Sequence, residues 1–285
     1  MEWKFERHAG ENLIEGLMKE PLWKKLKADC IKGDVYLAIR KDYISFYYKG
    51  GSLFKFKDSF STHIKYANVI DTNEDDSSKD YIRENELESI KKIKNFTAGY
   101  DRIKDMCELY SGLEAKGISN LYQENSYLHG KSIFVLDIEI AFKKGDKKQD
   151  RIDVLLYNND SQELRFVEAK LFSNDELWST DTPPVIKQIE KYEEQIKNHE
   201  GELIKQYGRY IDELYLIFGI KLNPPRKLDP KISLLVFGFD DAQKRSDRFK
   251  KLLKENMKDT NVRIYCKGKP NGLSADTIWK QAKST

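Results

Sequence analysis

Cysteine is scarce in this sequence: there are three residues in 285, Cys30, Cys107 and Cys266. They stand far apart, and no pair has the CxxC spacing of zinc sites and redox motifs. We therefore expect ordinary reduced thiols, and neither a structural zinc site nor a disulfide framework.

Several sequence motifs of common enzyme classes are also missing. The four histidines show no HExxH or HxH spacing, which argues against a zinc hydrolase and a histidine-based nuclease. The sequence has no GxxxxGK[ST] or GxGxxG loop and no GxSxG elbow, so ATP-driven, dinucleotide and Ser/His/Asp chemistry are unsupported.

No apolar run is long enough to predict a helix that crosses a bilayer, and Met1 to His8 lack the apolar core of a signal peptide. Charged residues make up 34% of the chain and mean hydropathy is -0.70, which is typical of a soluble protein. We therefore expect a cytoplasmic protein with no membrane partner.

Residues 1–72 combine a helical pattern with short strands. Apolar residues recur at three and four positions through residues 1–30, with a break near Pro21, and residues 35–67 hold four alternating runs typical of a β-meander. Aromatic residues and lysines are interleaved in these runs, as in Phe54-Lys55-Phe56. Such aromatics either stack nucleic-acid bases or pack inside the sheet, since half of each strand must face a core.

We divide the chain into three segments on this basis. Residues 1–72 form an N-terminal helix and β-meander that could serve as a recognition element, residues 73–84 form an acidic linker, and residues 85–285 form the main domain.

The main domain alternates strands and helices, which predicts an α/β fold with a mixed sheet flanked by helices. Apolar periodicity predicts a helix from Tyr81 to about Asn120, with Gly117 as its stop. Strands are expected at 132–142, 151–157, 164–171, 232–239 and 262–266, with helices after Pro183-Pro184 and at 241–257.

A predicted hairpin at residues 151–170 carries the only chemical signal that stands out. Its two apolar runs flank the turn-rich segment 158–162, and the turn pairs Tyr157 with Leu164. That register places Asp153 opposite Glu168, and Lys170 lies on the same face because side chains repeat every second residue.

Two neighbouring carboxylates repel each other unless a cation lies between them or one stays protonated. A Mg²⁺ ion uses few protein carboxylates and completes its shell with water and phosphate oxygens, while Lys170 could position or deprotonate a water or stabilise charge on a phosphate. This outline fits hydrolysis of a phosphodiester. Glu139, on the preceding strand, is either a third acidic group of the site or a residue at an open sheet edge.

Asp153, then Glu168-Ala169-Lys170, then a helix carrying Gln188 resemble the PD-(D/E)XK nuclease superfamily, whose fold is that of restriction endonucleases. The resemblance covers about residues 108–267. The Pro of the superfamily motif is absent, because Ile152 precedes the Asp.

The resemblance implies that Asp153 and Glu168 bind Mg²⁺ or Mn²⁺ with help from the Ala169 carbonyl. It further implies that Lys170 is catalytic and that Gln188 supports the site. In this superfamily the helix before the first core strand often adds one acidic residue. Glu114 is our candidate for that residue, with Glu108 as the alternative.

Most of the superfamily acts on DNA, so the resemblance favours a metal-dependent deoxyribonuclease over a ribonuclease and implies a role in restriction or anti-phage defence. Cutting both strands would favour a homodimer, because one site cleaves one strand at a time. Two alternatives stay open: a non-catalytic module that binds nucleic acid or protein on the same fold, and an unrelated α/β protein in which the cluster is a surface ion pair.

The C-terminal segment 221–285 is basic, with 16 Lys and Arg against 7 Asp and Glu. It could face a phosphate backbone. Alternatively, the basic residues within 244–258 are the solvated face of a helix.

Overall fold

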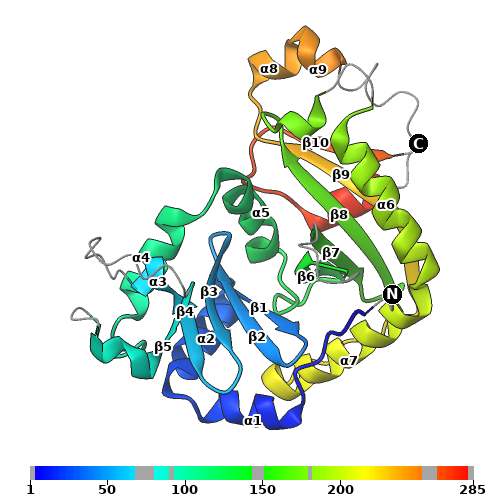
Figure 1. The fold of residues 1–285 in the computed structure, drawn as a ribbon. Helices are drawn as coiled ribbons and strands as arrows, with labels where there is room; N and C mark the ends of the chain where they lie inside the picture. The colour runs from blue at the N-terminus through cyan, green and yellow to red at the C-terminus, as the bar shows by residue number, and fades with distance from the viewer. Residues whose placement is uncertain are drawn as a thin grey trace. The chain divides into compact units, whose positions relative to one another are not determined.

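The computed structural model describes residues 4–67, 80–89, 93–142, 151–178, 182–251 and 262–281. They form two compact units, each with one five-stranded sheet and flanking helices (Figure 1). The N-terminal unit comprises Glu6–Ser119 and Arg209–Lys221, and the C-terminal unit comprises Met1–Phe5, Asn120–Gly208 and Leu222–Thr285. The predicted α/β class is confirmed. None of the described helices is long and apolar enough to cross a membrane.

The N-terminal unit contains an antiparallel sheet whose strands follow one another in chain order. This is the predicted β-meander, extended by a fifth strand. The strands are β1 Val35–Arg40, β2 Tyr43–Tyr48, β3 Gly51–Phe56, β4 Phe60–His63 and β5 Tyr81–Arg83. The other elements are helices α1 Glu11–Lys19, α2 Pro21–Lys32, α3 Ile64–Ala67 and α4 Tyr100–Tyr110, the 3-10 turn η1 Glu84–Ser89, the start of α5 (Leu113–Glu124) and the end of α7 (Glu200–Phe218).

Local chemistry explains two boundaries in this unit. The predicted helix break is confirmed: α2 begins at Pro21, which has no N–H to donate and suits the first turn of a helix. Between β2 and β3, Lys49 and Gly50 both have positive φ, 48° and 87°, as a two-residue hairpin turn requires. A Cβ on Gly50 would lie 2.4 Å from the backbone carbonyl carbon of Ala115, so this position also requires glycine.

The strand aromatics of this unit form its core. Phe54 and Phe56 are 0% and 2% exposed, and their rings lie 5.9 and 4.9 Å from the ring of Phe60. For these residues the packing alternative is therefore correct, and the base-stacking alternative is wrong.

The predicted helix from Tyr81 to Asn120 is wrong in the described residues before α4 begins at Tyr100, at the break between α4 and α5, and at its end. Tyr81 pairs with His63 as part of β5, because pairing with a neighbouring strand overrides the weak local helix preference. The helix α5 continues through Gly117 to Glu124, since a glycine costs only about 1 kcal/mol in a helix and burial of Ile118 offsets that. Residues 73–79 of the predicted linker lie outside the described residues.

The C-terminal unit contains a mixed sheet with the strand order β10-β9-β8-β7-β6. Strands β6, β7 and β8 pair antiparallel, whereas β8, β9 and β10 pair parallel. The predicted strands are all present: β6 Ile133–Ile140, β7 Ile152–Asn158, β8 Glu163–Leu171, β9 Lys227–Phe237 and β10 Arg263–Lys267. The central strand β8 is therefore covered by a neighbour on each side. Residues 143–150, which connect the predicted strands 132–142 and 151–157, lie outside the described residues.

Helix α6 (Pro184–Asn198) begins at the predicted Pro183-Pro184 and packs on β9. The predicted helix 241–257 is instead divided, as far as it is described, into α8 (Asp241–Arg245) and α9 (Asp247–Lys251). Ser246 is extended, and its Oγ accepts a hydrogen bond from the N–H of Phe249, which interrupts the helix. Helices α7 (Glu200–Phe218) and α10 (Ala275–Gln281) and the 3-10 turn η2 (Asp175–Leu177) were not predicted.

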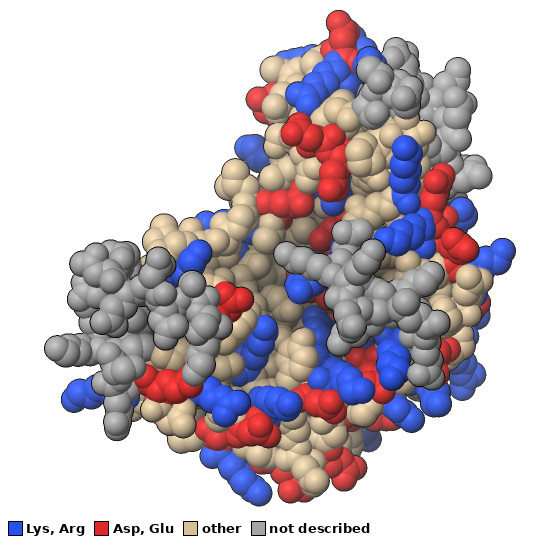
Figure 2. Space-filling model, viewed as in Figure 1, with Lys and Arg blue, Asp and Glu red and all other residues tan. Residues whose placement is uncertain are grey.

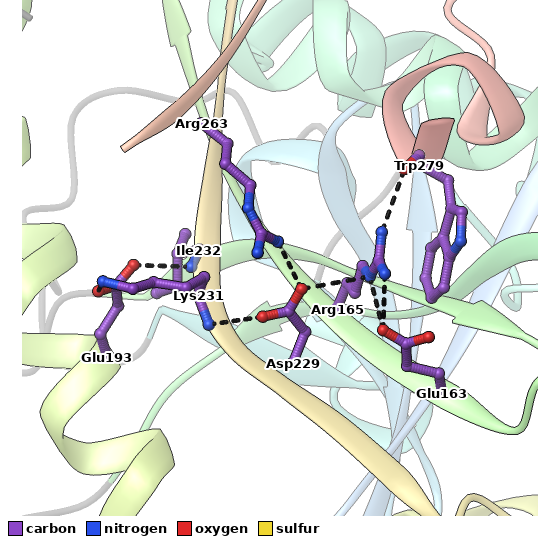
Figure 3. A network of polar contacts seen from close by, with 8 residues as sticks. All are labelled: Glu163, Arg165, Glu193, Asp229, Lys231, Ile232, Arg263 and Trp279. Atoms are coloured by element: carbon purple, nitrogen blue, oxygen red, sulfur yellow. Dashed lines mark hydrogen bonds and ion pairs between the residues drawn. The ribbon is translucent and has the colours of Figure 1, made fainter. Parts of the chain in front are cut away.

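A network of charged residues joins the first residues of β8 and β9 to β10 and α10 (Figure 3). The Arg165 guanidinium donates to Glu163 Oε1 at 2.7 and 2.9 Å and to the carbonyl of Trp279 at 3.1 Å, and its Cζ lies 4.0 Å from the Trp279 ring centroid. Asp229 pairs with both Arg165 and Arg263. Each charge in this set has a partner of opposite sign, so the network holds the sheet and α10 together.

We expect Arg165→Met to lower the free energy of unfolding by about 3 kcal/mol, because it leaves the partly buried Glu163 carboxylate without its cation and leaves Asp229 with Arg263 alone. Urea unfolding followed by circular dichroism measures this. The matched control is Lys280→Met, which removes an exposed pair with Asp276 and should cost less than about 1 kcal/mol. Equal losses in the two variants would contradict the structural role of Arg165.

Candidate functional site

The β7–β8 hairpin has the predicted register. Tyr157 pairs with Leu164 and Leu155 with Phe166. Beyond the last ladder pair, the backbone N–H of Ala169 donates a 2.7 Å hydrogen bond to Asp153 Oδ2. This bond holds the Asp153 carboxylate against the segment that contains Glu168 and Lys170.

Lys170 lies between two carboxylates. Its Nζ is 3.0 Å from Glu168 Oε1 and 2.7 Å from Glu176 Oε2, and the Lys170 and Glu168 side chains are 9% and 1% exposed. Burial alone would lower the pKa of Lys170, but the charge of Glu168, the hydrogen bonds to Glu176 and Glu168 and the charge of Asp153 together raise that pKa above its ordinary value. Lys170 is therefore a cation at neutral pH.

Asp153 is in the opposite electrostatic situation. Its burial, and next the charge of Glu168, raise its pKa well above the ordinary value, while the Ala169 N–H and the charge of Lys170 oppose that rise. The site thus contains more carboxylate charge than Lys170 neutralises. A bound divalent cation would favour the ionised form of Asp153.

Glu139 lies on β6, opposite Asp153 of the neighbouring strand β7. The flanking pairs Ile138 with Val154 and Ile140 with Ile152 set this position, and β6 is the last strand of the sheet. Glu139 pairs with Arg151 at 2.8 Å, and its charge adds to the rise in the pKa of Asp153. Glu139 therefore lies on the strand at the edge of the described sheet, and its charge also acts on Asp153; its role as a third acidic group of the site stays a prediction.

Glu139 has φ +53°, a left-handed conformation that is uncommon for a residue other than glycine. Such strain, of order 1–3 kcal/mol, is found often at functional sites.

The other predicted site residues lie further from this cluster in the chain. Gln188 is half-buried on α6, in the same unit. Glu114 on α5 and Glu108 on α4 belong to the N-terminal unit, and the cluster as described does not include them. Their roles, and that of the Ala169 carbonyl as a metal ligand, stay predictions.

Sequence reasoning missed Glu176. It lies on η2, between the predicted strand 164–171 and the predicted helix after Pro183-Pro184, six residues after Lys170. Asn174 Oδ1 accepts a hydrogen bond from the N–H of Glu176 and fixes the start of this turn. Asn174 was the only local sequence signal near Glu176. It predicts a turn, but it does not predict that Glu176 contacts Lys170.

The residues suit a Mg²⁺ or Mn²⁺ ion in number and chemistry. Among the described residues there is no group of three or more His, Cys, Asp or Glu arranged to hold a metal. Mg²⁺, however, is commonly held by one or two carboxylates together with water and substrate phosphate. Asp153 and Glu168 provide that number, and their mutual repulsion is what a cation would relieve.

Comparison of the chain with protein-family models, curated proteins and solved structures finds no match in any of the three. The likeness to PD-(D/E)XK nucleases therefore rests on the motif residues alone.

In buffer with EDTA, we expect Asp153→Asn to melt at a higher temperature than wild type at pH 7. Because the pKa of Asp153 is higher in the folded than in the unfolded wild type, the wild type loses stability as pH rises above the ordinary Asp pKa of about 3.9. Below that pH the folded and the unfolded wild type both carry the proton on Asp153. The melting temperatures of wild type and Asp153→Asn should therefore converge toward about pH 3–4. Thermal unfolding between pH 3 and 8 tests this. Asp160→Asn, in the exposed turn of the same hairpin, serves as control, and a less stable Asp153→Asn at pH 7 would refute the expectation.

Proposed function

We propose that this protein is a metal-dependent nuclease that hydrolyses phosphodiester bonds, with DNA as its substrate. Asp153 and Glu168 hold Mg²⁺ or Mn²⁺, Lys170 supplies positive charge at the reacting phosphate, and Gln188 supports the site. The observation that carries the proposal is a buried Glu168 and a half-buried Asp153 beside the buried Lys170 on adjacent strands.

The burial of this cluster weighs against a surface ion pair. The Glu168 and Lys170 side chains are 1% and 9% exposed, so the alternative of a surface ion pair does not fit them. Removing buried charges from water costs more than a single attraction returns, and the excess carboxylate here adds to that cost. A site that binds a cation explains why such an arrangement would be retained.

Each residue of the site has a defined task under this proposal. Asp153 and Glu168 present carboxylate oxygens to the ion from neighbouring strands, and the Ala169 N–H keeps Asp153 in position. Lys170, protonated at neutral pH, stabilises negative charge on the phosphate and does not serve as the base in the ion-free state. The divalent ion, when bound, supplies Lewis acidity and a water of lowered pKa.

We expect wild type to bind Mg²⁺ or Mn²⁺ by calorimetry and to cleave plasmid or single-stranded DNA, and Asp153→Ala to lose both activities. Asp160→Asn, which changes one carboxylate in the same hairpin, should keep both. If wild type binds no divalent ion even with DNA present, the catalytic proposal fails. The chain would then fit the alternative of a non-catalytic binding module on a nuclease-like fold.

Lys170→Gln should bind the ion but lose about a hundredfold to a thousandfold in kcat, because it removes the charge that stabilises the transition state. Single-turnover cleavage at saturating metal measures this loss. A variant that cleaves at the wild-type rate would remove Lys170 from the mechanism.

A further inference from the structure

The segment that follows β8 is tied into a compact loop. The N–H of Asn174 donates to the carbonyl of Leu171 at 2.8 Å, and the indole N–H of Trp178 donates to the carbonyl of Phe172 at 3.1 Å. The same loop carries Glu176, which pairs with Lys170 at 2.7 Å. These bonds hold Trp178 a short distance along the chain from the candidate active site.

Arg248 belongs to α9, and its side chain packs against two aromatic rings of this loop. Its guanidinium carbon is 4.1 Å from the centroid of the Trp178 ring and 5.8 Å from that of Phe172. The next residue, Phe249, is buried, and its ring lies 4.9 Å from the ring of Phe239 and 5.8 Å from that of Phe172. The packing of Phe249 therefore fixes the helix that presents Arg248.

Arg248 differs from its basic neighbours on α8 and α9. Lys244 and Arg245 are exposed, and Lys250 pairs with Asp247 at 3.3 Å, as expected for a solvated helix face. Arg248 is also exposed, but within the described part of the chain its contacts are with the two rings rather than with a carboxylate. Its charge is therefore available to an anion from outside the protein.

An arginine stacked on an aromatic ring is well suited to bind phosphate. The stacking restricts the planar guanidinium while its N–H groups at the edge stay accessible for two parallel hydrogen bonds to an oxyanion. Less side-chain freedom then has to be lost when the anion binds.

The distribution of charge on the face in Figure 2 favours individual placed cations for nucleic-acid binding there. Basic and acidic side chains are interspersed over the described residues on the face in Figure 2. A broad electrostatic surface is thus not what would attract a strand there. On this face, individual cations in defined positions would provide the contacts.

We propose that Arg248, held on Trp178, binds a phosphate of the nucleic-acid strand next to the phosphodiester that reacts at Lys170. The contacts of Glu176 with Lys170 and of Trp178 with Arg248 bring both cations against one loop, the loop that follows β8. The location beside a reacting phosphodiester rests on the proposed nuclease function, whereas the phosphate contact itself can be tested without any cleavage.

The test measures binding of a fluorescein-labelled single-stranded DNA oligonucleotide to the full chain in EDTA, over a range of salt concentrations. Arg248→Gln should weaken binding about tenfold and lower the slope of log K against log salt by about one. Arg245→Gln, an equal change of charge at an exposed site on α8, should stay within about twofold of wild type. Thermal unfolding should be the same for all three proteins.

Arg248→Lys separates the stacked guanidinium from a simple positive charge. It retains the charge but not the planar group, and we expect binding between that of wild type and that of Arg248→Gln. Wild-type affinity in Arg248→Gln or in Arg248→Lys, an equal loss in Arg245→Gln, or no DNA binding by wild type would each overturn the proposal.

Failure of this proposal can be told apart from failure of the nuclease proposal. Cleavage that depends on Asp153, together with normal DNA binding by Arg248→Gln, would refute the phosphate contact alone. Conversely, loss of binding in Arg248→Gln without any metal binding or cleavage by wild type would refute the nuclease and support Arg248 as a phosphate contact.

Discussion

The hydrogen bond from the Ala169 N–H to the Asp153 carboxylate is the contact on which the candidate site depends. It extends the β7–β8 register past the last ladder pair and holds a carboxylate where its neighbours are Glu168 and Lys170. Because β8 is the central strand, Glu168 and Lys170 are buried, and Asp153 beside them is half-buried. Burial turns a short charged motif into a site with shifted pKa values.

The same strand has two charged regions with opposite characters. Near its start, Arg165 is joined to Glu163 and Asp229, and the charges are matched and hold elements together. Near its end, carboxylates exceed the single lysine, and desolvation together with the charge of Glu168 raises the pKa of Asp153. Matched buried charge is what a structural network needs, whereas unmatched buried charge is typical of sites that bind an ion or a substrate.

Aromatic residues near lysine or arginine also have two roles in this chain. In the β-meander Phe54 and Phe56 are buried in the core. The alternation of aromatic residues with lysine in the sequence therefore does not predict a surface that binds nucleic acid. Trp178 and Arg248 are far apart in sequence, yet they are in contact in the C-terminal unit. A pairing of this kind is visible only when distant elements are packed together.

The sequence by itself determined the elements whose signals are local. Alternating apolar residues and a short turn set the β7–β8 register, and with it the meeting of Asp153, Glu168 and Lys170. Only the tertiary structure decided the strand at Tyr81, the division of the helix at Ser246, the contact of Glu176 with Lys170 and the position of Arg248 on Trp178. These features depend on partners far along the chain or on an irregular loop, where neither hydrophobic periodicity nor local propensity carries information about contacts.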